Sequence, residues 1–105
     1  MKSIHEFRRA IAAAGTETSH FMTAHLQKNA ADHGWSPKVI RHMSVDYNGG
    51  KFSIKHHPDH ADEVHKLEYG TPDSQPTAAM RKFANRQHEF EDFLISRIKQ
   101  HVGEL

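Results

Sequence analysis

Cysteine is absent from this sequence of 105 residues. The absence excludes disulfide bonds, thiolate metal sites and thiol catalysis, and it is typical of proteins that work in a reducing compartment. Long hydrophobic runs are absent as well. The N-terminal stretch MKSIHEFRRAIAAAG lacks the apolar core of a signal peptide, and no window approaches the roughly 18 apolar residues that a membrane-spanning helix needs. We therefore expect neither secretion nor membrane insertion.

Apolar residues of every kind are scarce. Hydrophobic residues make up 36% of the chain and charged residues 26%, and the mean hydropathy is -0.78. A chain of this length forms one domain with a single modest core, so we expect a partner to share in burying its apolar surface. The formal net charge of +1 is spread in pairs such as Arg8-Arg9 and Arg81-Lys82, which is not the clustered charge of a nucleic-acid-binding protein.

Sequence motifs of catalysis are also missing. The seven serines lie outside any GxSxG motif, and the glycines never fall in the GxGxxG or GxxxxGK order of nucleotide-binding loops. No HExxH pair of metal ligands occurs. The sequence therefore predicts a protein that is not an enzyme and that needs no cofactor.

The N-terminal third predicts one long helix over residues 3–33. Ser3 followed by Glu6 forms a capping box at its start, and Pro37 prevents the helix from resuming after its end. Gly15 and the threonines beside it predict a kink or break at residues 15–18, because glycine is unfavourable inside helices and threonine favours caps. The apolar stripe steps by three and four residues along Ile4, Phe7, Ile11, Ala14, Thr18, Phe21 and His25.

The middle of the sequence predicts a β-hairpin over residues 39–57. From Val39 the apolar period changes from that of a helix to two. Asn48-Gly49-Gly50 then supplies residues that tolerate positive φ, as a tight hairpin turn requires. A two-stranded ribbon is only marginally stable alone, so we expect it to lie against the helices.

The C-terminal half predicts a loop over 67–77 and a second long helix over 78–102, with Thr77 as its cap. Residues 61–67 are compatible with a short helix or with a third strand. The apolar positions of the last helix are Met80, Phe83, Phe90, Phe93, Leu94, Ile98 and Val102. The predicted fold class is α+β: an antiparallel sheet built around the hairpin, packed against a long N-terminal helix and a long C-terminal helix.

Eleven histidines stand out in a chain of this size. Their protonation would change the net charge strongly between about pH 7.5 and 5.5, so a pH response is one hypothesis. His57, His60 and His65 also lie within nine residues and offer ligands suited to zinc or nickel. His60 and His65 are five residues apart, which is off the three- or four-residue step of ligands on a helix, and a solvated polar turn is the favoured interpretation.

The stretch from Glu68 to Pro76 is the candidate interaction site. Gly70 permits a backbone turn that other residues cannot make, and Pro76 holds the chain extended before the last helix. A glutamate beside Tyr69 places a charge and a large amphipathic ring at the mouth of this loop. Aromatic residues such as tyrosine are enriched at protein contacts.

The same stretch resembles a known family. Glu68-Tyr69-Gly70-Thr71, followed by Pro76 and by Met80-Arg81 in a terminal helix, is similar to the signature of the tail-component family of long-tailed bacteriophages, the small tail-completion or head-to-tail joining proteins. The order of elements agrees with that family over nearly the whole chain. The sequence departs from it at Thr77-Ala78-Ala79, where an aromatic residue and a leucine are usual, and at Lys82-Phe83, where a second proline is usual.

The resemblance implies a structural virion protein that acts at the phage neck. It implies a homo-oligomeric ring, six-fold, that joins the head connector to the tail tube and leaves a lumen through which DNA passes. The subunit and neck contacts would then involve Glu68, Tyr69, Gly70, Thr71, Pro76, Met80 and Arg81. The implied location is the virion, and the host cytoplasm during assembly. Two alternatives remain: a tail terminator that caps the tail tube, and a small metal-binding protein that uses the three histidines.

Overall fold

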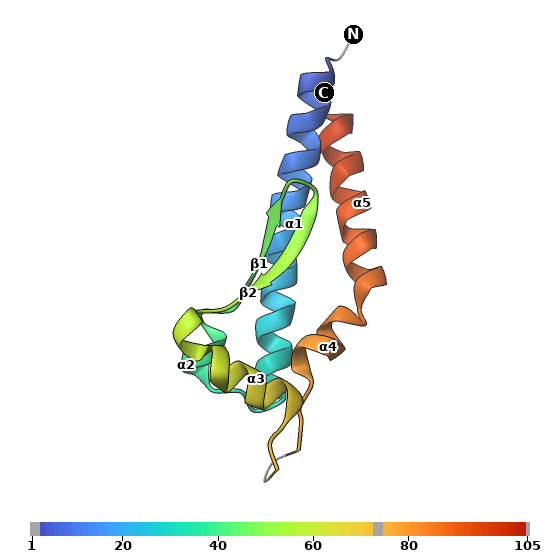
Figure 1. Cartoon of the computed structure of the whole chain (residues 1–105). Helices are drawn as coiled ribbons and strands as arrows, with labels where there is room; N and C mark the ends of the chain where they lie inside the picture. Colours follow the sequence, from blue (N-terminus) through green and yellow to red (C-terminus); the bar gives the residue numbers. More distant parts are fainter. Residues whose placement is uncertain (1–2, 73–74, 105) are drawn as a thin grey trace.

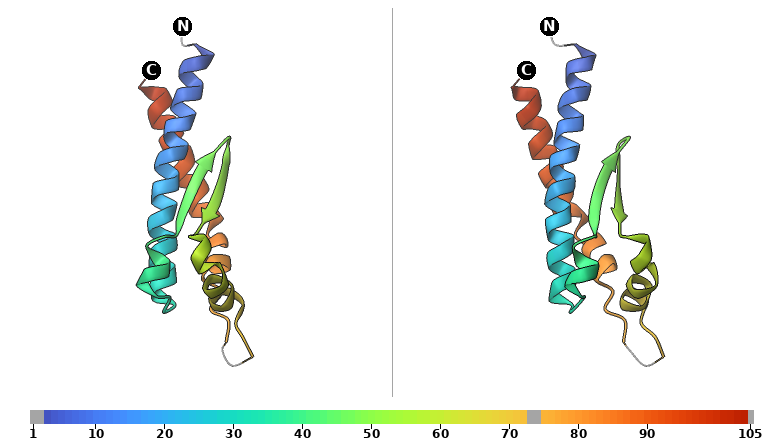
Figure 2. Two further views of the ribbon diagram at one scale, coloured as in Figure 1. Left: turned by 60° about the vertical axis from the view of Figure 1, so that its left-hand side comes forward. Right: turned by 90° about the vertical axis from the view of Figure 1, so that its left-hand side faces the viewer.

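Two long helices and a β-hairpin form the body of the protein, which is elongated, with extents of 62 × 25 × 18 Å (Figure 1). The computed structural model describes residues 3–72 and 75–104. Helix α1 (Ile4–Asp32) runs the length of the body, and α5 (Gln87–Gly103) returns antiparallel beside it, so both chain ends lie at one end of the molecule (Figure 2). The predicted fold class is confirmed.

Helix α1 begins where the capping box predicts. The Ser3 hydroxyl accepts a hydrogen bond from the Glu6 amide at 3.1 Å. The break that the sequence suggested at residues 15–18 is wrong, because α1 is continuous there. Thr18 does not cap a new helix; its hydroxyl donates to the Ala14 carbonyl at 2.7 Å, within the same helix.

A glycine is needed at position 15 of α1 because the hairpin lies directly on the helix there. A Cβ atom at this position would be 2.4 Å from Cε2 of Tyr47, in strand β1 (Ser44–Asn48). Only a residue without a side chain lets the tyrosine ring approach the helix backbone this closely. The glycine therefore marks a packing contact and not a break in the helix.

The hairpin is shorter than predicted. Residues Pro37–Ile40 form a short helix, α2, capped by Ser36, so the strands begin at Ser44 and not at Val39. Proline is favoured at the first position of a helix, and Pro37 thus starts a helix where we expected it only to prevent one. Strand β1 pairs antiparallel with β2 (Lys51–Lys55).

Two side chains of α1 hold the hairpin in register. Thr23 accepts a hydrogen bond from the Val45 amide at 2.8 Å, and Gln27 donates to the Met43 carbonyl at 2.9 Å. The predicted turn is confirmed, since Gly49 and Gly50 have φ of 59° and 82°. Val45 is buried against the helices, as the two-residue period predicts.

The segment after the hairpin is helical where the sequence left two options open. A short 3-10 helix, η1 (Pro58–His60), leads directly into α3 (Ala61–Tyr69). The predicted loop over 67–77 therefore begins three residues too early, because Leu67 to Tyr69 complete the last turn of α3. Gly70, with a φ of 81°, ends this helix.

The predicted C-terminal helix is two helices. Helix α4 (Ala79–Ala84) is followed by its C-cap residue Asn85, and α5 begins at Gln87. The break changes the direction of the chain, and it brings the rings of Phe83 and Phe90 to 4.8 Å from one another in the core. The proposed cap at Thr77 is wrong, because Ala78 precedes α4 in a left-handed conformation and the Thr77 hydroxyl bonds elsewhere.

The core is small and lies around the C-terminal half of α1. It includes Leu26, Ala30, Trp35, Val39, Met43, Val45, Val64, Ala79, Phe83 and Phe90. Toward the N-terminal end of α1, the helix pair is held instead by Glu17 of α1, which bonds to both Arg97 and His101 of α5. The hydrogen bond from Arg97 is the largest cause that lowers the pKa of Glu17, and His101 adds to it.

We predict that Gly15→Ala destabilises the protein, although alanine is favoured over glycine inside helices by about 1 kcal/mol. The new methyl group would displace the Tyr47 ring, and such overpacking costs about 1–3 kcal/mol. Urea unfolding measures the change. Gly103→Ala is the matched control, because a Cβ there meets nothing within 4 Å. If Gly15→Ala is as destabilising in a Tyr47→Ala background as in the wild type, the ring contact is not the cause.

Candidate functional site

The candidate site lies at the end of the molecule opposite the chain termini, where the end of α3 meets the start of α4. The described residues between them, 70–72 and 75–78, project beyond the ends of the helices (Figures 1 and 2). We call this end of the molecule the loop end. Its described residues include every residue of the predicted contact set, and residues 73 and 74, which lie within the predicted loop, are outside the described part of the chain.

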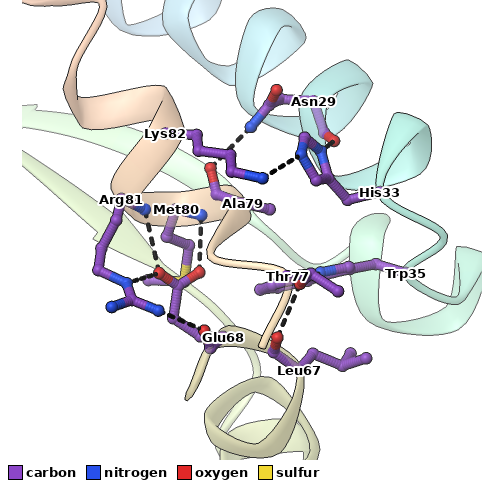
Figure 3. A network of polar contacts seen from close by, with 10 residues as sticks. All are labelled: Asn29, His33, Trp35, Leu67, Glu68, Thr77, Ala79, Met80, Arg81 and Lys82. Carbon is purple, nitrogen blue, oxygen red and sulfur yellow. Dashed lines mark hydrogen bonds and ion pairs between the residues drawn. The ribbon is translucent and has the colours of Figure 1, made fainter. Parts of the chain in front are cut away.

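Glu68 is the central residue of the site. It lies in the last turn of α3, and only 2% of it is exposed. Its carboxylate accepts hydrogen bonds from the backbone amides of Met80 and Arg81, at 2.7 and 3.1 Å (Figure 3). These amides belong to the first turn of α4, where helix geometry leaves the N–H groups without partners. Glu68 thus caps α4 from a different helix, with its negative charge at the favourable end of the helix dipole.

Arg81 completes the binding of the carboxylate. Its Nε donates to Glu68 Oε2 at 2.8 Å, and its Nη2 donates to the Glu68 main-chain carbonyl at 2.7 Å. The guanidinium also lies over the Tyr69 ring, 4.7 Å from its centre. We call Glu68, Tyr69, Met80 and Arg81 the clasp, because together they fasten the end of α3 to the start of α4. A charge removed from water is tolerated when it is paired and hydrogen-bonded in this way.

Thr77 fastens the part of the loop that leads into α4. Its hydroxyl donates to the Leu67 carbonyl at 2.7 Å and accepts from Nε1 of Trp35 at 2.6 Å. Its amide also donates to Leu67, at 2.9 Å. Asn29 of α1 donates to the Ala79 carbonyl at 2.7 Å, so the loop end is tied to the body of the molecule as well as to α3 (Figure 3).

The predicted contact residues fall into two groups. Glu68 is buried and bonded within the chain, whereas Tyr69 is 56% exposed and Pro76 is exposed on the loop. Gly70 has the positive φ that the sequence predicts. The part of each residue in a contact between subunits stays a prediction. In the structure, Glu68 and Arg81 form the base of the loop, and Tyr69 and Pro76 lie on its surface.

Sequence reasoning missed Asn29, Trp35 and Thr77 as members of the site. One signal was available for Trp35, since it is the only tryptophan and a buried indole N–H needs an acceptor. The acceptor turned out to be 42 residues away, and no local pattern identifies it. Asn29 lay unnoticed within a helix, where its polar side chain gave no reason to expect a bond to a carbonyl 50 residues later.

The histidines of the metal hypothesis are only partly brought together. His57 and His60 lie with His42, and the centres of these three rings are 5.2–5.5 Å apart. His65 lies instead against Tyr69, with ring centres 5.0 Å apart. Nδ1 of His57 accepts a hydrogen bond from the Asp59 amide at 3.1 Å. Over residues 3–72 and 75–104, no group of three or more histidine or acidic side chains is arranged to hold a metal ion.

The surroundings of His42 in this cluster disfavour its charged form. The pKa of His42 lies below its ordinary value, chiefly because of desolvation, and further because of the nearby Arg41, His57 and His60. Since the folded pKa is below the unfolded one, the unfolded chain binds more protons in the interval between them. The contribution of His42 to stability is therefore complete above about pH 6.5 and is lost as the pH falls through the folded pKa.

Comparison with models of known protein families, with curated proteins and with solved structures gives no match. Within the described part of the chain, no helix is long and apolar enough to cross a membrane.

We predict that Glu68→Ala destabilises the protein by about 2–4 kcal/mol, because two helix amides and a guanidinium lose a charged acceptor. Lys66→Ala, on the same helix, removes only the exposed ion pair with Asp62 and should cost no more than about 0.5 kcal/mol. Urea unfolding compares the two variants. Equal effects would show that the clasp contributes no more than a surface ion pair.

We predict that His42→Gln reduces the loss of stability between pH 7 and pH 5. The substitution removes a group whose pKa is lower in the folded state, so that proton uptake on unfolding decreases. Unfolding free energies measured at several pH values give the slope. His88→Gln is the control, because that side chain is 96% exposed. A slope that is the same in His42→Gln as in the wild type contradicts this account of the cluster.

Proposed function

We propose that this chain is a structural virion protein of the bacteriophage neck, a tail-completion or head-to-tail joining protein. In this role it forms a ring, six-fold, that connects the head connector to the tail tube, and DNA passes through the lumen. The partners are copies of the chain itself, the head-connector protein and the tail-tube or tail-terminator protein. The protein is located in the virion, at the neck, and in the host cytoplasm during assembly.

The observation that carries the proposal is the clasp. The resemblance to the phage family rests on two short pieces of sequence, Glu68 to Thr71 and Met80-Arg81, and on Pro76 in the loop between them. In the structure the glutamate of the first piece bonds to the arginine and to two amides of the second. The two pieces of the signature are therefore bonded to one another in the structure, and each depends on the other for its partners. If the match to so short a signature were due to chance, there would be no reason to expect hydrogen bonds between its two pieces.

The position of the clasp also suits a joining protein. The clasp fixes both ends of a projecting loop, and it leaves the Tyr69 ring more than half exposed beside that loop. A loop held at its base loses less conformational freedom when it binds, which favours affinity. Tyrosine supplies a large apolar surface with a polar tip, as contacts between proteins commonly do.

A tail terminator is the competing function in the same setting, because such a protein also forms a ring at the end of the tail tube. Electron microscopy of particles assembled without this chain separates the two functions. Tails of normal length that lie free of heads indicate joining. Over-long tails indicate termination.

We predict that phage carrying Tyr69→Ala make a folded protein but yield unjoined heads and tails. The substitution removes exposed aromatic surface at the loop end and leaves the Glu68 bonds to α4 in place. Particle counts by electron microscopy and infectious titre measure the effect. Lys38→Ala is the control, because Lys38 is exposed in α2, outside the clasp and the loop. A normal yield of joined particles from Tyr69→Ala contradicts the role assigned to this surface.

A further inference from the structure

Strand β2 is the outer strand of the hairpin. It pairs with β1 along one edge, and β1 is the strand that lies against α1 (Figure 2). The other edge of β2 has no strand beside it, because the sheet of the described residues contains only these two strands. Such an edge presents backbone N–H and C=O groups with which a further strand can pair.

The backbone groups of Phe52 and Ile54 lie on this free edge. In an antiparallel pair, residues that exchange hydrogen bonds alternate with residues whose N–H and C=O groups point outward. The two residues that flank the tight turn are a bonded pair, so Phe52 and Ile54 are outward-pointing. Thr23 of α1 supports this alternation, because it binds the amide of Val45, the partner of Ile54, at the opposite edge. Within residues 3–72 and 75–104, no hydrogen bond reaches the outward groups of Phe52 and Ile54.

A largely apolar groove lies beside the free edge, between β2 and helices α4 and α5. It has a volume of about 540 Å³, and the half-buried side chains of Phe52 and Ile54 line it. The polar part of its lining includes Lys51 and Glu91, and Glu91 already accepts a hydrogen bond from Gln87 at 2.6 Å. The edge thus offers main-chain hydrogen bonds, and the groove offers room for the side chains of an added strand. Proteins that bind extended peptides by strand addition use these two features together.

We propose that the free edge of β2 binds an extended segment of a different protein, which adds a third strand to the hairpin. The N–H and C=O groups of Phe52 and Ile54 bond to the backbone of this segment. The residues directly opposite them lie on the same face of the sheet, beside the groove, and are therefore apolar.

The two ends of β2 determine the charge of the segment. Lys51 and Lys55 are exposed, and neither forms an ion pair within the described part of the chain. Their partners in β1 are Asn48 and Ser44, which carry no charge, and Asp46 between these partners bonds to neither lysine. Residues directly opposite one another on a sheet stabilise the pairing when their charges differ. The segment therefore has an acidic residue opposite each lysine.

A second copy of this chain is a poor occupant of the edge. Antiparallel pairing of β2 with itself can satisfy the outward groups of Phe52 and Ile54, but it places Lys51 opposite Lys55 of the second copy at both ends of the contact. Like charges directly opposite one another are destabilising, and lysines on an edge strand commonly prevent self-association. An acidic segment of another protein meets no such obstacle. The inference does not depend on the neck function.

The test uses the capped peptide Ser-Glu-Val-Thr-Val-Glu-Ser as the probe. When its valines lie opposite Phe52 and Ile54, its glutamates lie opposite Lys51 and Lys55. We expect titration into the isotope-labelled full chain to shift the NMR signals of the Phe52 and Ile54 amides, with a Kd below about 1 mM. The same peptide with N-methylated valines lacks the donors of the main-chain bonds, and it should bind at least about tenfold more weakly.

Exchange of charge tests the pairing at the two ends. The double variant Lys51→Glu, Lys55→Glu should bind the glutamate peptide at least about tenfold more weakly than the wild type does, and it should prefer the same peptide with lysines in place of glutamates. The matched control is Lys38→Glu, Lys99→Glu, which changes the net charge equally at exposed positions of α2 and α5. This control should bind like the wild type. Circular dichroism checks that both variants are folded.

Four outcomes overturn the inference. Three concern the peptide: a Kd above about 1 mM for the glutamate peptide, equal binding of its N-methylated form, and a control variant as defective as the β2 variant. The fourth is a shift of the Phe52 and Ile54 signals with protein concentration alone, which would make a second copy the occupant. The Tyr69→Ala phage test the neck function separately, so either proposal can fail alone.

Discussion

A carboxylate that leaves water must find donors on several sides, and Glu68 finds them at the start of α4. The two amides that donate hydrogen bonds to it would otherwise have no partner in the protein, because Ala78 has no polar side chain with which to cap them. The carboxylate and the helix terminus thus satisfy one another. Arg81 adds a balancing charge and bonds back to the Glu68 carbonyl. These hydrogen bonds determine the geometry of the loop end, since they fix the distance between α3 and α4 and hence the base of the loop.

The rest of the molecule holds the clasp in place with few contacts. One small core around the C-terminal half of α1 holds the hairpin, α2, α3 and α4 together, and bonds from Asn29 and Trp35 connect it to the loop end. The other end consists mainly of the α1–α5 pair, joined through Glu17, and it leaves Ile4, Phe7 and Ile11 exposed. The protein therefore has a well-anchored loop at one end and an apolar surface at the other. Such an arrangement is compatible with the proposed role as a subunit of a ring.

Local chemistry explains which elements the sequence could predict. Asn48-Gly49-Gly50 determines the hairpin turn, and Ser3 with Glu6 determines the start of α1, because each effect acts within a few residues. The errors arose where distant contacts decide. Gly15 was interpreted as a helix breaker, but Tyr47 explains it. Glu68 was identified as part of a site, but its role as a cap depends on amides twelve and thirteen residues later, across a loop. Thr77 has a suitable side chain for a cap and uses it to bind Leu67 and Trp35 instead.

Amide hydrogen exchange of Met80 and Arg81 tests the central claim most directly. In an ordinary helix, the amides of the first turn bond to water and exchange rapidly. Because Glu68 binds both amides in a site shielded from solvent, we predict that they exchange as slowly as amides in the core of the protein. Exchange of these two amides at the rate of exposed loop amides would contradict the account, since it would show that the carboxylate does not hold the start of α4.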